Sequence, residues 1–148
     1  MKIEEIMTGN VISVSPATRV SEVARILGEN RIGAVPVVDD AGKVVGIISE
    51  SDLFLKEKGI PFSVVKVPQL FNQWVDPSRL DSFFREIESH IAGDVMSAPA
   101  ITISPEESAG EAAALMFQNK ISRLPVVVDG RLVGIVSRSD IIRWMAAQ

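Results

Sequence analysis

The stretch Val45–Asp52 reads VGIISESD, and it returns almost unchanged at Val133–Asp140 as VGIVSRSD. Outward from this pair, residues 6–38 align with residues 95–127 without a gap, at an offset of 89. One residue is lost near Ala41, so the closing stretches match at an offset of 88. Self-similarity at a fixed period indicates a repeated structural unit. The chain therefore contains two copies of one unit.

Each copy predicts the same order of elements: strand, helix, strand, turn, strand and helix. Short β-favouring runs stop at Ser-Pro, and apolar residues then recur at helical spacing. The expected strands are 11–14, 34–38 and 44–48 in the first copy and 100–103, 124–128 and 132–136 in the second. The expected helices are 20–27 and 109–116, with short ones after Asp52 and Asp140. The predicted fold class is α/β (α+β), made of two β-α-β-β-α repeats.

Residues 59–90 belong to neither copy. A helix is predicted from Asp76-Pro77, an N-cap residue followed by proline at the first helical position. Its apolar face, which reaches Ile91, is either an extra cover for the core or an exposed partner surface. The expected division is repeat 1 at 1–58, a linker with one helix at 59–90, and repeat 2 at 91–148.

The composition is that of a globular protein without disulfides. Of the 148 residues 47% are hydrophobic, and none is cysteine. The formal net charge of −4 gives no electrostatic reason to bind nucleic acid or an anionic membrane, so we expect neither as a partner. The start is acidic where a signal peptide is apolar, and no stretch approaches the ~18 apolar residues of a membrane helix. We expect a cytoplasmic protein.

Side chains suited to catalysis or metal binding are scarce. The chain has a single histidine, His90, with no cysteine and no tyrosine, whereas a zinc site needs three or four ligands. Neither a Gly-x-Ser-x-Gly elbow nor a phosphate-binding glycine motif is present. We therefore predict no enzymatic activity, no metal site and no obligatory cofactor.

With these motifs in this order, the chain resembles a tandem pair of cystathionine-β-synthase (CBS) domains. The likeness rests on Met7-Thr8 and Met96-Ser97 at the starts of the units, on the Pro-Val-Val cores, and on the two closing stretches. It covers both repeats and leaves residues 59–90 out. The resemblance implies that the two units pack sheet to sheet in a pseudo-twofold module. Two clefts between the halves are then expected to hold adenosine-containing ligands.

The resemblance also implies roles for the closing motif. Asp52 and Asp140 are expected to hold a ribose diol, with Ser49 and Ser137 near phosphate. Physical chemistry supports this, because an ionised carboxylate accepts the two hydrogen bonds that a vicinal diol donates, and a helix start favours an anion. The residues alone leave a second interpretation open, in which these side chains only cap helix N-termini.

A purine needs a flat apolar slot beside the ribose site. We expect the starts of the strands to form it. The candidates are Ile12, Val35 and Pro36 in the first repeat and Ile101, Leu124 and Pro125 in the second.

The two repeats differ in charge at two positions. Repeat 2 has Arg123 where repeat 1 has Ala34, and Arg138 where repeat 1 has Glu50. The resemblance implies phosphate contacts from basic residues near these positions. We therefore predict unequal clefts, one with both arginines and the other with Glu50. The alternative for each arginine is a solvated surface charge.

The sequence thus predicts a regulatory module that binds AMP, ADP or ATP. The alternative is a CBS scaffold without a ligand that acts in protein interaction or dimerisation. Because the sequence ends soon after the second repeat, we expect regulation in trans of a partner that the sequence does not identify. Apolar residues on outward helix faces predict a homodimer. These residues are Leu27, Leu53, Phe54, Met116 and Ile142.

Overall fold

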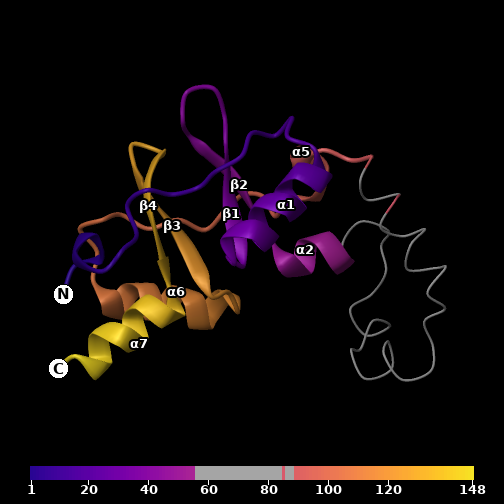
Figure 1. Cartoon of the computed structure of the whole chain (residues 1–148). Coiled ribbons are helices and arrows are strands. Elements are labelled where there is room, and N and C mark those ends of the chain that lie inside the picture. Colours follow the sequence, from indigo (N-terminus) through magenta and orange to yellow (C-terminus); the bar gives the residue numbers. More distant parts are fainter. Residues whose placement is uncertain (56–84, 86–88) are drawn as a thin grey trace, which may run out of the picture.

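Two antiparallel β-hairpins lie side by side at the centre of the molecule, each with two helices of its own half (Figure 1). The structure is a computed structural model, and it describes residues 1–55, 85 and 89–148. The first half contains α1 (Val20–Asn30), β1 (Ala34–Val38), β2 (Val44–Ser49) and α2 (Glu50–Leu55). The second half contains α6 (Ala109–Asn119), β3 (Arg123–Val128), β4 (Arg131–Ser137) and α7 (Arg138–Ala146). Short helices η1 (Ile3–Glu5) and α5 (Ala92–Val95) precede the halves.

The predicted helix at Asp76-Pro77 falls outside the described residues. Within the ranges that the structure describes, no helix is both long enough and apolar enough to cross a membrane.

The hairpins form where the sequence predicts them. β1 pairs with β2 and β3 pairs with β4. Asp129 and Gly130 have φ angles of 52° and 80°, and two positive φ angles are what a type I′ turn requires. The tips of the hairpins also bond to each other, because the Val44 amide donates to the Gly130 carbonyl and the Leu132 amide to the Gly42 carbonyl. These bonds tie the two halves together at one end.

The predicted first strand of each repeat is reduced to a single bridge. Val14 pairs in parallel with Val37, through the Val14 amide to the Pro36 carbonyl and the Val38 amide to the Val14 carbonyl. In one direction along the strands, the next hydrogen bond of the ladder would need a backbone N–H from Pro36. In the other direction, it would need a backbone N–H from Pro16. Proline has no N–H group, so the ladder stops in both directions. The second half has the same arrangement. Ile103 makes the single bridge, and Pro125 and Pro105 are the prolines that stop the ladder.

The closing helices begin earlier than the sequence analysis predicted. Both start directly after the serine of the motif, so Asp52 and Asp140 lie in the first helical turn rather than before it. Ser137 is the N-cap of α7, and its hydroxyl accepts from the Asp140 amide while the Asp140 carboxylate accepts from Ser137. This reciprocal arrangement is a capping box, which satisfies donors that the helix start leaves unpaired.

The two halves exchange the segments that lead into them. Ile3 is fully buried in the core of the second half, whereas Ala92 and Val95 are buried in the core of the first half. The backbone bonds follow the same rule, since the Ile3 amide donates to the Glu107 carbonyl at 2.8 Å and the Ala92 amide donates to the Thr18 carbonyl at 2.7 Å. Each core is therefore closed by the segment that precedes the other half (Figure 1).

A methionine in each exchanged segment packs on a glycine of the hairpin that it crosses. Met96 covers Gly46 of β2, and Met7 covers Gly134 of β4. A Cβ atom at position 46 would lie 2.6 Å from the Met96 sulfur and 3.0 Å from the Ser97 carbonyl oxygen. Because one of these neighbours is backbone, the space cannot be opened by a side-chain rotation alone. Gly46 and Gly134 are therefore the points of closest approach between segment and hairpin.

We expect Gly46→Ala to lower the free energy of unfolding by about 1–3 kcal/mol, because the added methyl overpacks the contact with the exchanged segment. Gly28→Ala is the matched control. Position 28 lies within α1 with nothing near its Cβ direction, so alanine there should stabilise the protein by about 0.5–1 kcal/mol. Urea denaturation measures both variants. Equal effects of the two substitutions would contradict the close approach at Gly46.

Candidate functional site

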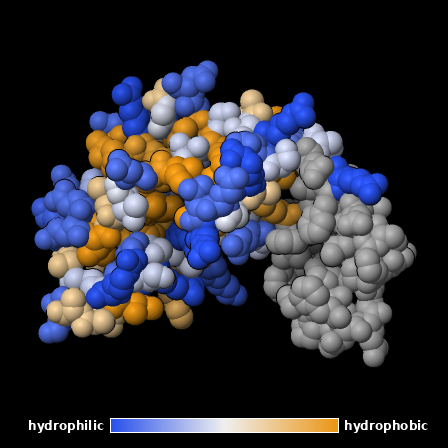
Figure 2. All heavy atoms as spheres, viewed as in Figure 1, coloured by the Kyte–Doolittle hydropathy of each residue, from blue (hydrophilic) through white to orange (hydrophobic). Residues whose placement is uncertain are grey.

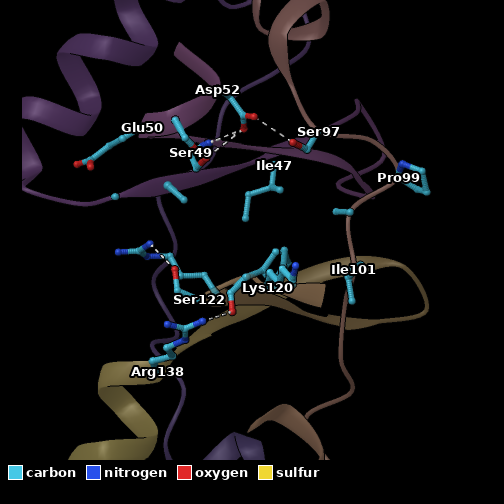
Figure 3. A pocket seen from close by; sticks show the side chains of 17 residues that line it. Ile47, Ser49, Glu50, Asp52, Ser97, Pro99, Ile101, Lys120, Ser122 and Arg138 are labelled. Carbon is cyan, nitrogen blue, oxygen red and sulfur yellow. Dashed lines mark hydrogen bonds between the residues drawn. The ribbon is translucent and has the colours of Figure 1, made fainter. Parts of the chain in front are cut away.

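A cleft of about 620 Å³ lies between the two halves (Figure 3). One wall comes from the end of β2, the start of α2 and the exchanged segment after α5, whose Ser97 pairs with Ile47, and the facing wall comes from the start of β3 and the residues before it. This volume is in the range of small-molecule sites. The described residues that line it include Ala34, Ile47, Ser49, Glu50, Ser51, Asp52, Ser97, Pro99, Ile101, Lys120, Ser122, Arg123, Pro125 and Arg138.

Asp52 is the buried charged side chain of this cleft, with 4% of its surface exposed. Its Oδ2 accepts hydrogen bonds from the Ser49 amide at 2.9 Å and from the Ser49 hydroxyl at 3.2 Å. Its Oδ1 accepts from the Ser97 hydroxyl of the exchanged segment at 3.1 Å, and the two side chains point toward each other in Figure 3. The carboxylate therefore caps α2 with one oxygen and accepts a hydrogen bond from the exchanged segment with the other.

The apolar lining agrees with only part of the predicted purine slot. Ile101 and Pro125 line the cleft, together with Ile47 and Pro99, which the sequence analysis did not single out. Val35 and Leu124 do not line it, because both are fully buried in the two hydrophobic cores. Successive residues of a strand face opposite sides, so Ala34 and Pro125 turn toward the cleft while their neighbours Val35 and Leu124 turn inward.

The charges are not divided between two clefts as predicted. Arg123, Arg138 and Glu50 all line the same cleft, with Lys120 as a further cation. The reason is geometric: the starts of β1 and β3 meet near the middle of the molecule, so that a Cβ atom on Gly33 would lie 2.8 Å from Arg123 Cζ. In Figure 3 Glu50 points away from Asp52, and Arg138 lies at the opposite end of the cleft from Asp52.

Both arginines are held by neutral oxygens of the second half. Arg123 donates to the Ser122 hydroxyl at 3.1 Å, and Arg138 donates to the Ile121 carbonyl at 3.4 Å. A guanidinium has five N–H donors, so these bonds leave each arginine able to donate to an anion. The cleft thus has the Asp52 carboxylate at one end and Arg138 at the other, and Glu50, Lys120 and Arg123 also line it.

The remaining predicted residues are the counterparts, in the other repeat, of residues that line the cleft of Asp52. Ser137 and Asp140 start α7 as Ser49 and Asp52 start α2. Ile12 is the counterpart of Ile101 and has 40% of its surface exposed, and Pro36 is the fully buried counterpart of Pro125. These four residues do not line the cleft of Asp52.

Sequence reasoning did not give a site role to Ser97 or Lys120. Ser97 was recognised as the start of the second unit, yet its contact with Asp52 depends on the exchange of segments. Lys120 ends α6 in the left-handed conformation, with φ 55°, and residues that end a helix directly before a strand are the signal that could have found it. His90 lies outside the cleft lining, with Nδ1 3.7 Å from an Asp94 oxygen. Among the described residues no cluster of metal-ligating side chains was found.

We expect Ser97→Ala to lower the free energy of unfolding by about 1.5–3 kcal/mol, because it removes a hydrogen bond to a buried carboxylate that joins the halves. Thr8 occupies the equivalent place in the other exchanged segment, and within the described chain its hydroxyl makes no side-chain hydrogen bond. Thr8→Ala should therefore stay within about 0.5 kcal/mol of the wild type. A thermal or urea melt in which Thr8→Ala costs as much as Ser97→Ala would contradict the link.

Known proteins share this architecture. The chain is 30% identical over 134 residues to the CBS domain-containing protein CBSX1, chloroplastic, of Arabidopsis thaliana, which covers 88% of this chain. The chain spans 57% of the length of that relative and 58% of the related CBSX2. The crystal structure of CBSX2 superimposes with a TM-score of 0.79 at 26% identity, covering 99% of this chain and 94% of that one.

Two solved complexes are also similar. The crystal structure of CBSX2 in complex with AMP has a TM-score of 0.73 at 26% identity and covers 99% of this chain and 96% of that one. The CBS domain pair of protein MJ0100, in complex with 5-methylthioadenosine and S-adenosyl-L-methionine, has a TM-score of 0.72 at 26% identity, with 99% and 97% covered. The family model described as CBS domain matches residues 3–58 and 92–147. The chain therefore belongs to the CBS domain family, and it carries two CBS domains in tandem.

Proposed function

We propose that this CBS pair is a regulatory module that binds an adenosine-containing ligand of the AMP, ADP or ATP class and has no catalytic activity of its own. The observation that carries the proposal is the buried Asp52 carboxylate, which lines a cleft between the halves and has one oxygen bonded to Ser97, a second residue of the cleft lining. A buried carboxylate is costly unless donors surround it, and a ribose diol supplies two donors. The similar structures solved with AMP and with methylthioadenosine and S-adenosylmethionine support the adenosine class.

The rest of the cleft offers partners for the other parts of a nucleotide. Ile47, Ile101 and Pro125 supply apolar surface for a purine. Arg123 and Arg138 supply donors for phosphate, and Arg138 lies at the end of the cleft away from Asp52. The hydroxyl of Ser97 now donates to Asp52, and a ribose hydroxyl would take its place or join it. Because the two walls belong to different halves, a ligand in this cleft would fix the halves relative to each other.

The position of α6 and α7 favours self-association as part of this function. Phe117, Ile142 and Met145 are 85%, 63% and 62% exposed, and apolar atoms reach the surface over these helices in Figure 2. Two of the residues used to predict the dimer belong instead to the cores, because Leu27 and Met116 are buried. Leu53 is partly buried, and the Phe54 side chain lies outside the described residues.

The corresponding face of α1 is polar. Arg25 forms ion pairs with Glu22 and Glu29 there, and its hydrogen bond lowers the pKa of the Glu22 carboxyl. We propose that a homodimer forms through the apolar α6 and α7 face. A scaffold that dimerises through this face without any ligand is the second candidate function. Action in trans and a cytoplasmic location stay predictions from the sequence, as do the boundaries 1–58, 59–90 and 91–148.

Isothermal titration calorimetry with AMP and adenosine tests the proposed function. We expect both to bind, and Asp52→Asn to weaken both, because the amide has one acceptor oxygen and no charge where the carboxylate offers the diol two acceptors. Arg123→Ala should weaken AMP by about one to two factors of ten, the worth of a charge-assisted bond of about 1.5–3 kcal/mol, while adenosine is nearly unaffected. If neither ligand binds, the scaffold function is favoured. Equal losses for AMP and adenosine in Arg123→Ala would show that the arginine does not serve phosphate.

Light scattering at micromolar concentration tests the dimer. We expect twice the chain mass for the wild type and the monomer mass for Phe117→Glu, because a charge cannot be buried in an apolar interface without a partner. Val128→Glu is the control, since Val128 is also exposed, at 46%, but lies at the tip of the second hairpin. A wild type that is monomeric, or a Val128→Glu variant that dissociates equally, would contradict this interface.

A further inference from the structure

The carboxylate of Asp140 has its two oxygens engaged in different ways. Oδ2 accepts from the Ser137 amide at 2.8 Å and from the Ser137 hydroxyl at 2.9 Å, which caps α7. Oδ1 accepts from Nη2 of Arg143 at 2.6 Å. The Arg143 side chain runs back along its own helix, with Nε donating to the Ser139 carbonyl at 3.3 Å. The guanidinium is thus placed directly on the second carboxylate oxygen.

The backbone and the serine donors around Asp140 are arranged like those around Asp52. In both, the serine amide and hydroxyl hold Oδ2. In both, an exchanged segment pairs with the strand before the helix. Thr8 and Ile135 exchange two backbone bonds of 2.9 and 3.0 Å, and Ser97 and Ile47 exchange bonds of 2.9 and 3.1 Å. Oδ1 of Asp52 accepts from the Ser97 hydroxyl of the exchanged segment. The equivalent oxygen of Asp140 is the one that Arg143 holds.

This pairing comes from a difference between the repeats. At the offset of 88, position 143 corresponds to position 55, which is leucine in this chain. Arginine is therefore not required to build this part of the unit. The Arg143 side chain is 74% exposed, whereas the Asp140 side chain is 10% exposed. An exposed guanidinium can leave for solvent, so the pair is weak enough to be opened by a competing donor.

We infer that Arg143 is a specificity-determining residue for a second adenosine site at Asp140, where it competes with the ribose diol for Oδ1. The inference rests on the proposed function, because it takes the diol as the group that Asp140 would hold. A ligand with a diol must release the guanidinium before it can use both carboxylate oxygens. A ligand without those hydroxyls has no such requirement. Arg143 therefore lowers the preference of this site for an intact ribose.

Calorimetry on the full chain with adenosine and with 2′,3′-dideoxyadenosine tests this competition, since neither ligand has a phosphate that Arg143 could bind. The site in question is the one that Asp140→Ala removes. Arg143→Leu gives repeat 2 the leucine that repeat 1 has at the equivalent position, 55. It should tighten adenosine at this site by about two- to fivefold, the range expected for release of an exposed ion pair, and leave dideoxyadenosine unchanged. Arg143→Lys keeps a charged donor and should stay near the wild type.

Salt gives a second readout that a structural role of Arg143 would not move. Because salt screens an exposed pair, added salt should tighten adenosine at this site in the wild type and not in Arg143→Leu. Unchanged or weaker adenosine binding in Arg143→Leu, or an equal shift for both ligands, overturns the inference while leaving the proposed function intact. A wild type that binds adenosine at neither site overturns both.

Discussion

The exchange of leading segments is the constraint on which the rest of the structure depends. Ile3 closes the core of the second half, and Ala92 and Val95 close that of the first. A fully buried aliphatic side chain contributes about 1.5–3 kcal/mol, so each core is stabilised by the segment that precedes the other half. The same crossing lays Ser97 along β2, within reach of Asp52. The cleft exists because the halves are interlocked, and its two walls cannot come from one repeat.

Capping and ligand binding are not competing roles for the aspartate of the closing motif. In Asp52 one oxygen receives the donors of Ser49, and the other receives the hydroxyl of Ser97. The cap fixes the orientation of the carboxylate, and that orientation sets which oxygen faces the cleft. Asp140 keeps the cap and differs at the second oxygen, where Arg143 is bound. Two copies of one motif can therefore share a fold and differ in what they accept.

Local features of the sequence predicted much of the fold. Both hairpins and the helices α1 and α6 lie where the pattern of residues places them. Periodicity shows that a residue is buried but not against which half it packs. The exchange of segments was therefore missed, and with it the pairing of Ser97 with Asp52. The same limit put Glu50 in the wrong cleft, because proximity across the middle of the molecule has no local signal.

The central claim is that one adenosine ligand touches walls from both halves, and hydrogen exchange of the chain with and without saturating AMP tests it most directly. The account predicts slower exchange of backbone amides in two separate stretches, the end of β2 with the start of α2 in the first half, and the residues from Lys120 to the start of β3 in the second half. Slowing in both would show that the ligand bridges the halves. Binding of AMP with protection confined to one half, or to the outer face of α6 and α7, would contradict the account.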